Sequence, residues 1–106
     1  MKTLNKVLNE GRKERETQFG FSPNPVVKCK DGYQVSIQCS KGTYCTPRQD
    51  YANVDSYTAF ELGFPNEHDD LIEGYAKEQN NQTDTVFAYV PSKVVEDLLE
   101  KHGGAV

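Results

Sequence analysis

The polar segment 40–56, SKGTYCTPRQDYANVDS, contains the side chains best suited to binding chemistry. Tyrosine and arginine are over-represented among the residues that contribute most to binding at protein interfaces, and this segment holds Tyr44, Arg48 and Tyr51. Arginine also clamps anions and tyrosine stacks on bases, so the same side chains suit a nucleotide or another small anionic ligand. We therefore predict a binding loop with the candidate residues Lys41, Tyr44, Arg48, Asp50 and Tyr51.

Cys45 is the strongest candidate nucleophile in this segment. Arg48 would lower the pKa of the Cys45 thiol if the fold brought the two together, and a Cys–His pair would also need His68 or His102 nearby. His68 lies in an acidic stretch. His102 lies at the carboxyl end of an expected helix, where the helix dipole favours a positive imidazole. Because each histidine has a structural explanation, we predict an inert thiol and a protein that is not an enzyme.

The sequence lacks the spacing of a metal or cofactor site. Cys29, Cys39 and Cys45 follow the pattern CX9CX5C, which matches neither a zinc site nor a disulfide framework. The acidic run 67–70 lacks EF-hand spacing, and the chain contains no phosphate-binding, zinc-protease or nucleophile-elbow motif. We predict no metal and no cofactor, and we expect an acidic patch that could meet a basic partner, formed by Glu67, Asp69 and Asp70.

A β-hairpin precedes the binding loop. Its residues alternate apolar and polar types around Asp31-Gly32, a dipeptide typical of a two-residue type I′ turn. This register places Lys28 opposite Val35 and predicts a core face of Val26, Tyr33, Val35, Ile37 and Cys39. The other face then holds Val27, Cys29, Gln34, Ser36 and Gln38. The last three fit either ordinary solvent-facing alternation or a hydrogen-bonding platform beside the loop.

Two further strands are expected, at residues 56–64 and 86–90. Alternation in the first, SYTAFELGF, places Phe60 and Leu62 in the core, and the second, VFAYV, is short and apolar. Residues 43–45 could add one more short strand.

Three helices are expected around these strands. Residues 1–25 form a weak amino-terminal helix, over 2–18 with Thr3 as its cap and Gly11 interrupting its pattern, and a Pro-rich connector pinned by Phe19 and Phe21. Asn66 caps a second helix, and the helix dipole favours the acidic residues in its first turn. The buried stripe of this helix is Leu71, Ile72, Tyr75 and Ala76. A final helix begins after Pro91-Ser92, ends at Gly103, and buries Val94, Val95, Leu98 and Leu99.

These elements predict a single α+β domain spanning residues 1–106. Its sheet is small and antiparallel-dominated, made of the hairpin plus two further strands, with helices packed on one face. The order of the strands is not fixed by the pattern, because the hairpin defines only one pairing.

Charge is distributed unevenly along the chain. Residues 1–30 hold seven Lys/Arg against three Asp/Glu, and residues 31–106 hold five against thirteen, so the balances of +4 and −8 give the net charge of −4. An acidic body disfavours general nucleic-acid binding, which needs clustered cations. No apolar run approaches the roughly 18–20 residues of a membrane span, and the amino terminus lacks a signal-peptide core, so we expect no membrane and a cytoplasmic protein.

Several stretches resemble short proteins encoded by bacteriophages and prophages. They are DGYQVSIQCS with YCTPR, then YTAFELGFPNE, then DTVFAYVPSKVVEDLLEKHGG, and the resemblance extends over the run 31–106. The resemblance implies a phage accessory product that acts in the cytoplasm of a bacterial host. Small acidic phage proteins often bind and block a host protein, including defence factors. No residue's role follows from this resemblance.

The sequence thus supports two classes of function. The first is a binding protein that inhibits a host protein by steric or charge-complementary docking. The alternative is a small-ligand or nucleotide-binding module, a sponge or regulator that uses the Tyr/Arg loop. A homodimer through an edge strand or the final helix is compatible with both classes.

Overall fold

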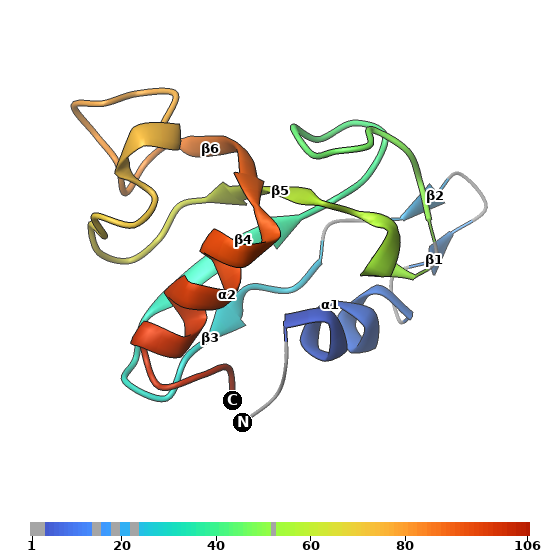
Figure 1. Cartoon of the computed structure of the whole chain (residues 1–106), viewed down its shortest axis with the longest axis horizontal. Coiled ribbons are helices and arrows are strands. Elements are labelled where there is room, and N and C mark those ends of the chain that lie inside the picture. Colours follow the sequence, from blue (N-terminus) through green and yellow to red (C-terminus); the bar gives the residue numbers. More distant parts are fainter. Residues whose placement is uncertain (1–3, 14–15, 18–19, 22–23, 52) are drawn as a thin grey trace.

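The structure is a computed structural model that describes residues 4–13, 16–17, 20–21, 24–51 and 53–106 (Figure 1). Four antiparallel strands form an open sheet in the order β3-β4-β5-β6: Val27–Lys28, Gln34–Gln38, Ala59–Gly63 and Val86–Pro91. Two helices, α1 (Leu4–Lys13) and α2 (Ser92–Lys101), accompany the sheet, and β1 (Glu16–Thr17) pairs with β2 (Gly20–Phe21) separately. The predicted α+β class with an antiparallel sheet is confirmed.

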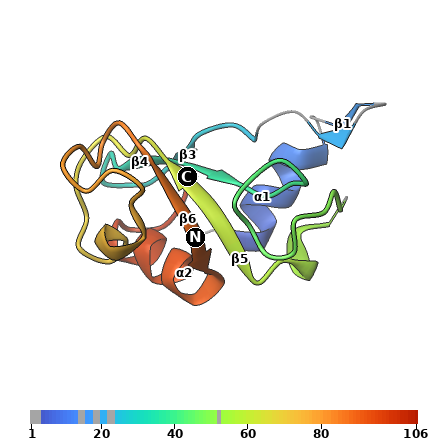
Figure 2. The same cartoon turned by 90° about the horizontal axis from the view of Figure 1, so that it is seen from above.

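The core lies between the sheet and the two helices. The helix α2 packs along β5 and β6 on one side of the sheet and also contacts α1 (Figure 2). Alternation places Ile37 of β4 opposite Leu62 of β5, and both side chains are fully buried. The helices supply the other half of the core with Leu4, Leu8, Val95, Leu98 and Leu99.

The hairpin turn has one residue more than the sequence predicts. The register pairs Val27 with Val35, and Cys29 both donates to the carbonyl of Tyr33 and accepts from the amide of Gly32. Gly32 has a φ of +97°, as in a three-residue loop that closes with a glycine bulge. The predicted type I′ turn is therefore wrong.

This one-residue shift exchanges the two faces of the first hairpin strand. Val27 and Cys29, expected outside, are buried, whereas Val26, expected in the core, is 51% exposed. The other expected core residues of the hairpin are buried as predicted: Tyr33, Val35, Ile37 and Cys39. All three cysteines are buried, and none of them forms a disulfide.

The helix expected after Pro65 is not formed. Turns and a single 3-10 turn, η2 (Glu73–Tyr75), occupy this region. The side chain of Asn66 accepts from the amide of Gln34 and donates to the carbonyl of Gly32, so it extends the hairpin instead of capping a helix. Of the expected stripe, Ile72 is fully buried and Leu71 is 40% exposed. Long-range hydrogen bonds outweigh local helix propensity here.

The final helix is confirmed and the amino-terminal helix is shorter than expected. Helix α2 begins at Ser92, and Gly103 follows its end with a φ of +89°. Helix α1 ends at Lys13 and continues through Gly11, while Thr3, Phe19 and the side chain of Phe21 lie outside the described residues. Residues 43–45 form no strand.

The long loop 40–56 is ordered by a short helical turn and by the sheet. A 3-10 turn, η1 (Val54–Ser56), is capped by Asn53, and Thr46 pairs with Ala59 at the start of β5. No helix in the described part of the chain is long and apolar enough to span a membrane.

Candidate functional site

A β-bulge in β6 lies at the centre of the candidate site. Phe60 pairs with Val90 and Leu62 with Phe87, so Glu61 alone lies opposite both Ala88 and Tyr89. Tyr89 adopts a φ of +53°, a left-handed conformation that residues other than glycine, asparagine and aspartate seldom adopt. Bulges of this kind bend a strand and redirect a side chain.

Tyr44 is held beside the bulge by two backbone hydrogen bonds. Its amide donates to Oε2 of Glu61 over 3.0 Å, and its carbonyl accepts from the amide of Tyr89 over 3.0 Å. The rings of Tyr44 and Tyr89 are tilted by 48° with centroids 6.0 Å apart. They are 38% and 43% exposed, so two neighbouring tyrosines from distant parts of the sequence face solvent together.

Two cations lie against the Tyr44 ring. The guanidinium carbon of Arg48 is 5.5 Å and Nζ of Lys77 is 4.9 Å from the ring centroid, both within cation–π distance. Within the described residues neither cation makes an ion pair. We call Tyr44, Arg48, Lys77 and Tyr89 the aromatic–cationic patch.

A shallow hollow on the open face of the sheet adjoins this patch through Glu61. It has a volume of about 140 Å³, and its lining includes Ser36, Gln38, Gly63 and Val86. Phe64 also lines it, is 58% exposed and has a φ of +49°. The sheet therefore presents a second aromatic residue in a left-handed conformation.

The expected polar platform on β4 is partly occupied by the chain itself. The side-chain oxygen of Gln38 accepts a hydrogen bond from the backbone amide of Asn24. The side-chain nitrogen of Gln38 donates to the backbone carbonyl of Asn24 and to the hydroxyl of Ser36. Gln38 therefore fixes the connector in place, Ser36 lines the hollow, and Gln34 is exposed beside Asn66.

The other candidate loop residues mainly order the loop. The carboxylate of Asp50 accepts from the amide of Lys41 over 2.9 Å. The amide of Tyr51 donates to the hydroxyl of Tyr57, and the two rings meet edge to face. Tyr51 is 38% exposed.

The expected acidic patch is divided. Glu67 and Asp70 are exposed, whereas the side chain of Asp69 is 2% exposed and pairs with His102 and Lys101. His102 lies between two carboxylates, with Nδ1 2.6 Å from Oδ2 of Asp31 and Nε2 2.7 Å from Oδ2 of Asp69. Asp69 therefore binds the end of α2 through Lys101 and His102, and its side chain is not exposed to a partner.

The charges in this cluster determine the pKa values of its members. Burial opposes the charged form of His102, but hydrogen bonds and charge from Asp31 and Asp69 outweigh it and raise its pKa. Burial likewise opposes a charged Asp69, yet hydrogen bonds from the Leu71 amide, His102 and Lys101 lower its pKa. The pKa of Asp31 is lowered by its hydrogen bond from the Tyr33 amide and then by His102. The cluster is therefore structural, because both imidazole nitrogens are occupied.

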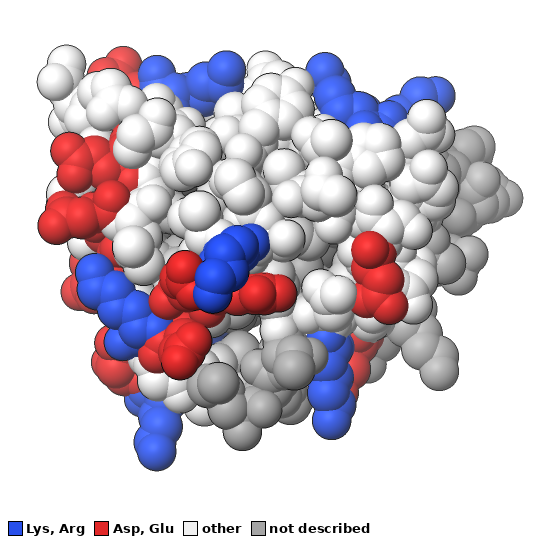
Figure 3. Space-filling model, in the orientation of Figure 1, with Lys and Arg blue, Asp and Glu red and all other residues white. Residues whose placement is uncertain are grey.

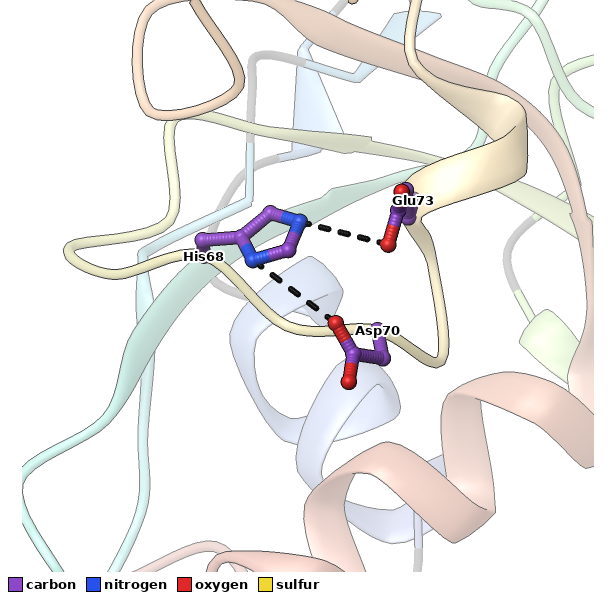
Figure 4. Close-up of side chains that lie close together, drawn as sticks. All are labelled: His68, Asp70 and Glu73. Carbon is purple, nitrogen blue, oxygen red and sulfur yellow. Dashed lines mark ion pairs between the residues drawn. The ribbon is translucent and has the colours of Figure 1, made fainter.

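His68, Asp70 and Glu73 form an exposed cluster with metal-ligating atoms within 4.8 Å of one another (Figure 4). Nδ1 of His68 faces Asp70 at 3.8 Å, and Nε2 faces Glu73 at 3.5 Å. One metal ion can use only one of these nitrogens. All three side chains are exposed, and the observed contacts are those of a histidine between two acids, an arrangement that surface residues adopt without a metal.

Cys45 is buried and hydrogen-bonded to backbone. Its Sγ lies 3.2 Å from the carbonyl oxygen of Ser40 and 3.3 Å from that of Pro47. A thiol that donates to carbonyls in the core is poorly placed to attack a substrate.

Sequence reasoning missed three residues of this surface: Phe64, Lys77 and Tyr89. Tyr89 belongs to an apolar run that reads as a buried strand, and no residue type in that run signals a positive φ. Lys77 reaches Tyr44 because its amide donates to the carbonyl of Val86 at the edge of the sheet.

Comparison with protein-family models, with curated proteins and with solved structures yields no significant match for this chain. What can be inferred about function therefore comes from the surface itself. Figure 3 shows one face on which uncharged side chains cover the middle and the upper part, with Lys and Arg along the upper edge, Asp and Glu at the left, and side chains of both charges below.

Proposed function

We propose that this chain is a non-enzymatic binding protein that docks onto a partner macromolecule through the aromatic–cationic patch. A protein of a bacterial host is the partner that the resemblance to phage products suggests, and inhibition would follow from covering a surface of that protein. The observation that carries the proposal is Tyr89, an exposed tyrosine at a β-bulge with a φ of +53°.

Tyr89 is an energetically unfavourable choice for the fold alone. A non-glycine residue in the left-handed region costs on the order of 1–2 kcal/mol, and strain of this kind concentrates at functional sites. Glycine would relieve it, and burial of the side chain offsets it only in part, since Tyr89 is 43% exposed. A use in binding explains why a tyrosine stands there.

The composition of the patch agrees with a protein interface. Tyrosine and arginine dominate the energetically important contacts of such interfaces, because they bring large, rigid contact areas. Tyr44 and Tyr89 are fixed by backbone hydrogen bonds, so little conformational entropy is lost on docking. This favours a pre-formed contact surface.

A small anionic ligand is the second candidate, because Arg48 and Lys77 both lie against the Tyr44 ring. Ligand sites are usually concave and several hundred Å³ in volume. The adjoining hollow, at about 140 Å³, is smaller than that. The geometry therefore favours the macromolecular partner.

The test combines capture with a double variant. Bacterial lysate is passed over the immobilised chain, over Tyr44→Ala/Arg48→Ala, and over the control Leu71→Ala/Lys93→Ala, which removes an exposed apolar group and an exposed cation outside the patch. The captured protein is then purified and its affinity measured by calorimetry. We expect the patch variant to bind at least about thirtyfold more weakly, as for a hot spot of roughly 2 kcal/mol, and the control to bind normally.

Equal binding by both variants would overturn the surface assignment. A stoichiometric small molecule that co-purifies with the chain and is lost from the patch variant would instead establish the ligand-binding alternative. Thermal stabilisation by that molecule would confirm it.

A further inference from the structure

We propose that the partner presents an acidic protein segment to the aromatic–cationic patch, with carboxylates against Arg48 and Lys77 and an apolar side chain against Tyr44 and Tyr89. This inference rests on the proposed function and specifies the chemistry of its partner. It follows from the balance of charges at the patch and from the way the tyrosines are held.

The two cations of the patch are uncompensated. Within the described residues, Arg48 and Lys77 contact the Tyr44 ring and have no carboxylate partner, although the chain has an excess of acids with a net charge of −4. By contrast, Lys93 pairs with Asp97 and Lys101 with Asp69. Free cations in an acidic protein are positioned to receive a carboxylate from outside.

Glu61, the acid that lies opposite the bulge, is hydrogen-bonded to the backbone of the patch. The Oε2 atom of Glu61 accepts from the amide of Tyr44 over 3.0 Å, which keeps this carboxylate at the backbone of the patch. Among the described residues, neither Arg48 nor Lys77 forms an ion pair with this carboxylate, so both cations can face an incoming anion. Arginine and tyrosine together also provide the planar donor and the flat apolar surface that a carboxylate next to an apolar side chain requires.

Nucleic acid fits the patch less well than an acidic segment. Binding along a phosphate backbone depends on a stripe of cations, because each neutralised phosphate adds to the affinity. The patch has two cations, and residues 31–106 carry a balance of −8. A short run of carboxylates matches two cations, whereas a longer polyanion would meet the acidic remainder of the surface.

The experiment measures amide chemical-shift changes of the isotope-labelled full chain with four probes. The acidic probe is a short peptide in which glutamates flank one phenylalanine, and the neutral probe has glutamine in place of each glutamate. The third is a short single-stranded thymidine oligonucleotide, and the fourth is inorganic phosphate. We expect the acidic probe to shift Tyr44, Arg48, Lys77 and Tyr89 and to bind roughly tenfold more tightly than the neutral probe at low salt.

Two variants make the result specific. Arg48→Gln/Lys77→Gln should bind the acidic and neutral probes equally, whereas the control Lys28→Gln/Lys93→Gln, which removes two exposed cations outside the binding loop and the patch, should keep the preference. Added salt should remove the preference in the wild-type chain.

Each other outcome overturns the inference in a recognisable way. Equal binding of the acidic and neutral peptides, or binding of the oligonucleotide alone at the same residues, refutes the acidic partner but leaves the patch as a docking surface. Equal shifts with phosphate alone indicate a small-anion site. If no probe shifts the patch, and the double alanine variant captures partners normally, both this inference and the proposed function fail.

Discussion

The Nε2 atom of His102 lies 2.7 Å from Oδ2 of Asp69, and this contact joins the end of α2 to the loop after β5. The other imidazole nitrogen contacts Asp31 in the hairpin turn, and the Tyr33 ring stacks on the imidazole with centroids 3.9 Å apart. The His102 side chain therefore connects three segments that are far apart in the sequence: the end of α2, the loop after β5 and the hairpin turn. The carboxyl-terminal end depends on the charge of this histidine.

We predict that stability falls as pH rises from the acidic side of neutrality. The folded-state pKa of His102 is raised, so its stabilising contribution is fully present below the unfolded value of about 6.5 and is lost as pH rises through the folded value. The pKa values of Asp31 and Asp69 are lowered, so their contributions hold above about 3.9 and are lost as pH falls through the folded values. Urea unfolding at intervals of about one pH unit between about pH 4 and pH 9 measures the decline that is due to His102.

The variant His102→Gln should be less stable by about 2–4 kcal/mol at pH 6 and should lose the decline above neutrality, because it leaves Asp69 buried with one charged partner fewer. The exposed His68→Gln is the matched control and should retain the wild-type profile. If the wild-type free energy of unfolding is flat from pH 5 to pH 9, the imidazole is not held charged and the assignment is wrong.

Hairpin register can be checked by two neighbouring valines. Val27 is 4% exposed and Val26 is 51% exposed. Val27→Ala should therefore lower the free energy of unfolding by about 2 kcal/mol, and Val26→Ala should change it by less than about 0.5 kcal/mol. Thermal or urea unfolding measures both. The reverse order of effects would restore the two-residue turn that Asp31-Gly32 suggests.

This register illustrates how far the sequence determines the structure. The strand β4 and the helix α2 are predictable, because alternation in Val35 and Ile37 and the spacing of Val95 and Leu98 are strong local signals. The turn length is not, since Asp-Gly fits both the type I′ turn and the observed bulged loop. One residue of difference then reassigns every side chain of β3.

The failed helix after Pro65 has a different cause. Asn66 and Asp69 look like a cap and a first-turn acid, but their actual partners are Gln34 and His102, more than thirty residues away. Local propensity contains no information about such contacts. The candidate site combines both situations: Tyr44 and Arg48 are recognisable by type, whereas Tyr89 and Lys77 join them only through the bulge and the sheet edge.

Cys45 is predicted to be unreactive in the folded chain. Its thiol is 1% exposed, and Cys29 and Cys39 are also buried. For Cys29, burial and then the charge of Asp31 raise the pKa of the thiol as well. Iodoacetamide at neutral pH should modify all three at least about tenfold more slowly in the native protein than in urea, because modification requires opening of the structure. Rapid alkylation of Cys45 alone in the native chain would reopen the case for a cysteine enzyme.

Substitutions at Tyr89 separate stability from binding. Tyr89→Gly removes the ring and relieves the positive φ, whereas Tyr89→Ala removes the ring and keeps the strain. We expect the glycine variant to be about 1 kcal/mol more stable than the alanine variant in urea unfolding. Both should bind the acidic peptide at least about tenfold more weakly than the wild-type chain. Tyr89→Phe keeps the ring and should retain most of the affinity.

The comparison of glycine with alanine isolates the strain, because relief of the left-handed conformation must exceed the roughly 0.5–1 kcal/mol that the greater backbone entropy of glycine in the unfolded chain costs. If glycine is the less stable of the two, the strain at Tyr89 is smaller than this entropic cost and the main support for the docking surface disappears. If the glycine variant is more stable yet binds as well as the wild type, the strain is real but the tyrosine is not retained for this partner. Only higher stability together with lost binding shows that the chain sacrifices stability at Tyr89 in order to present its ring.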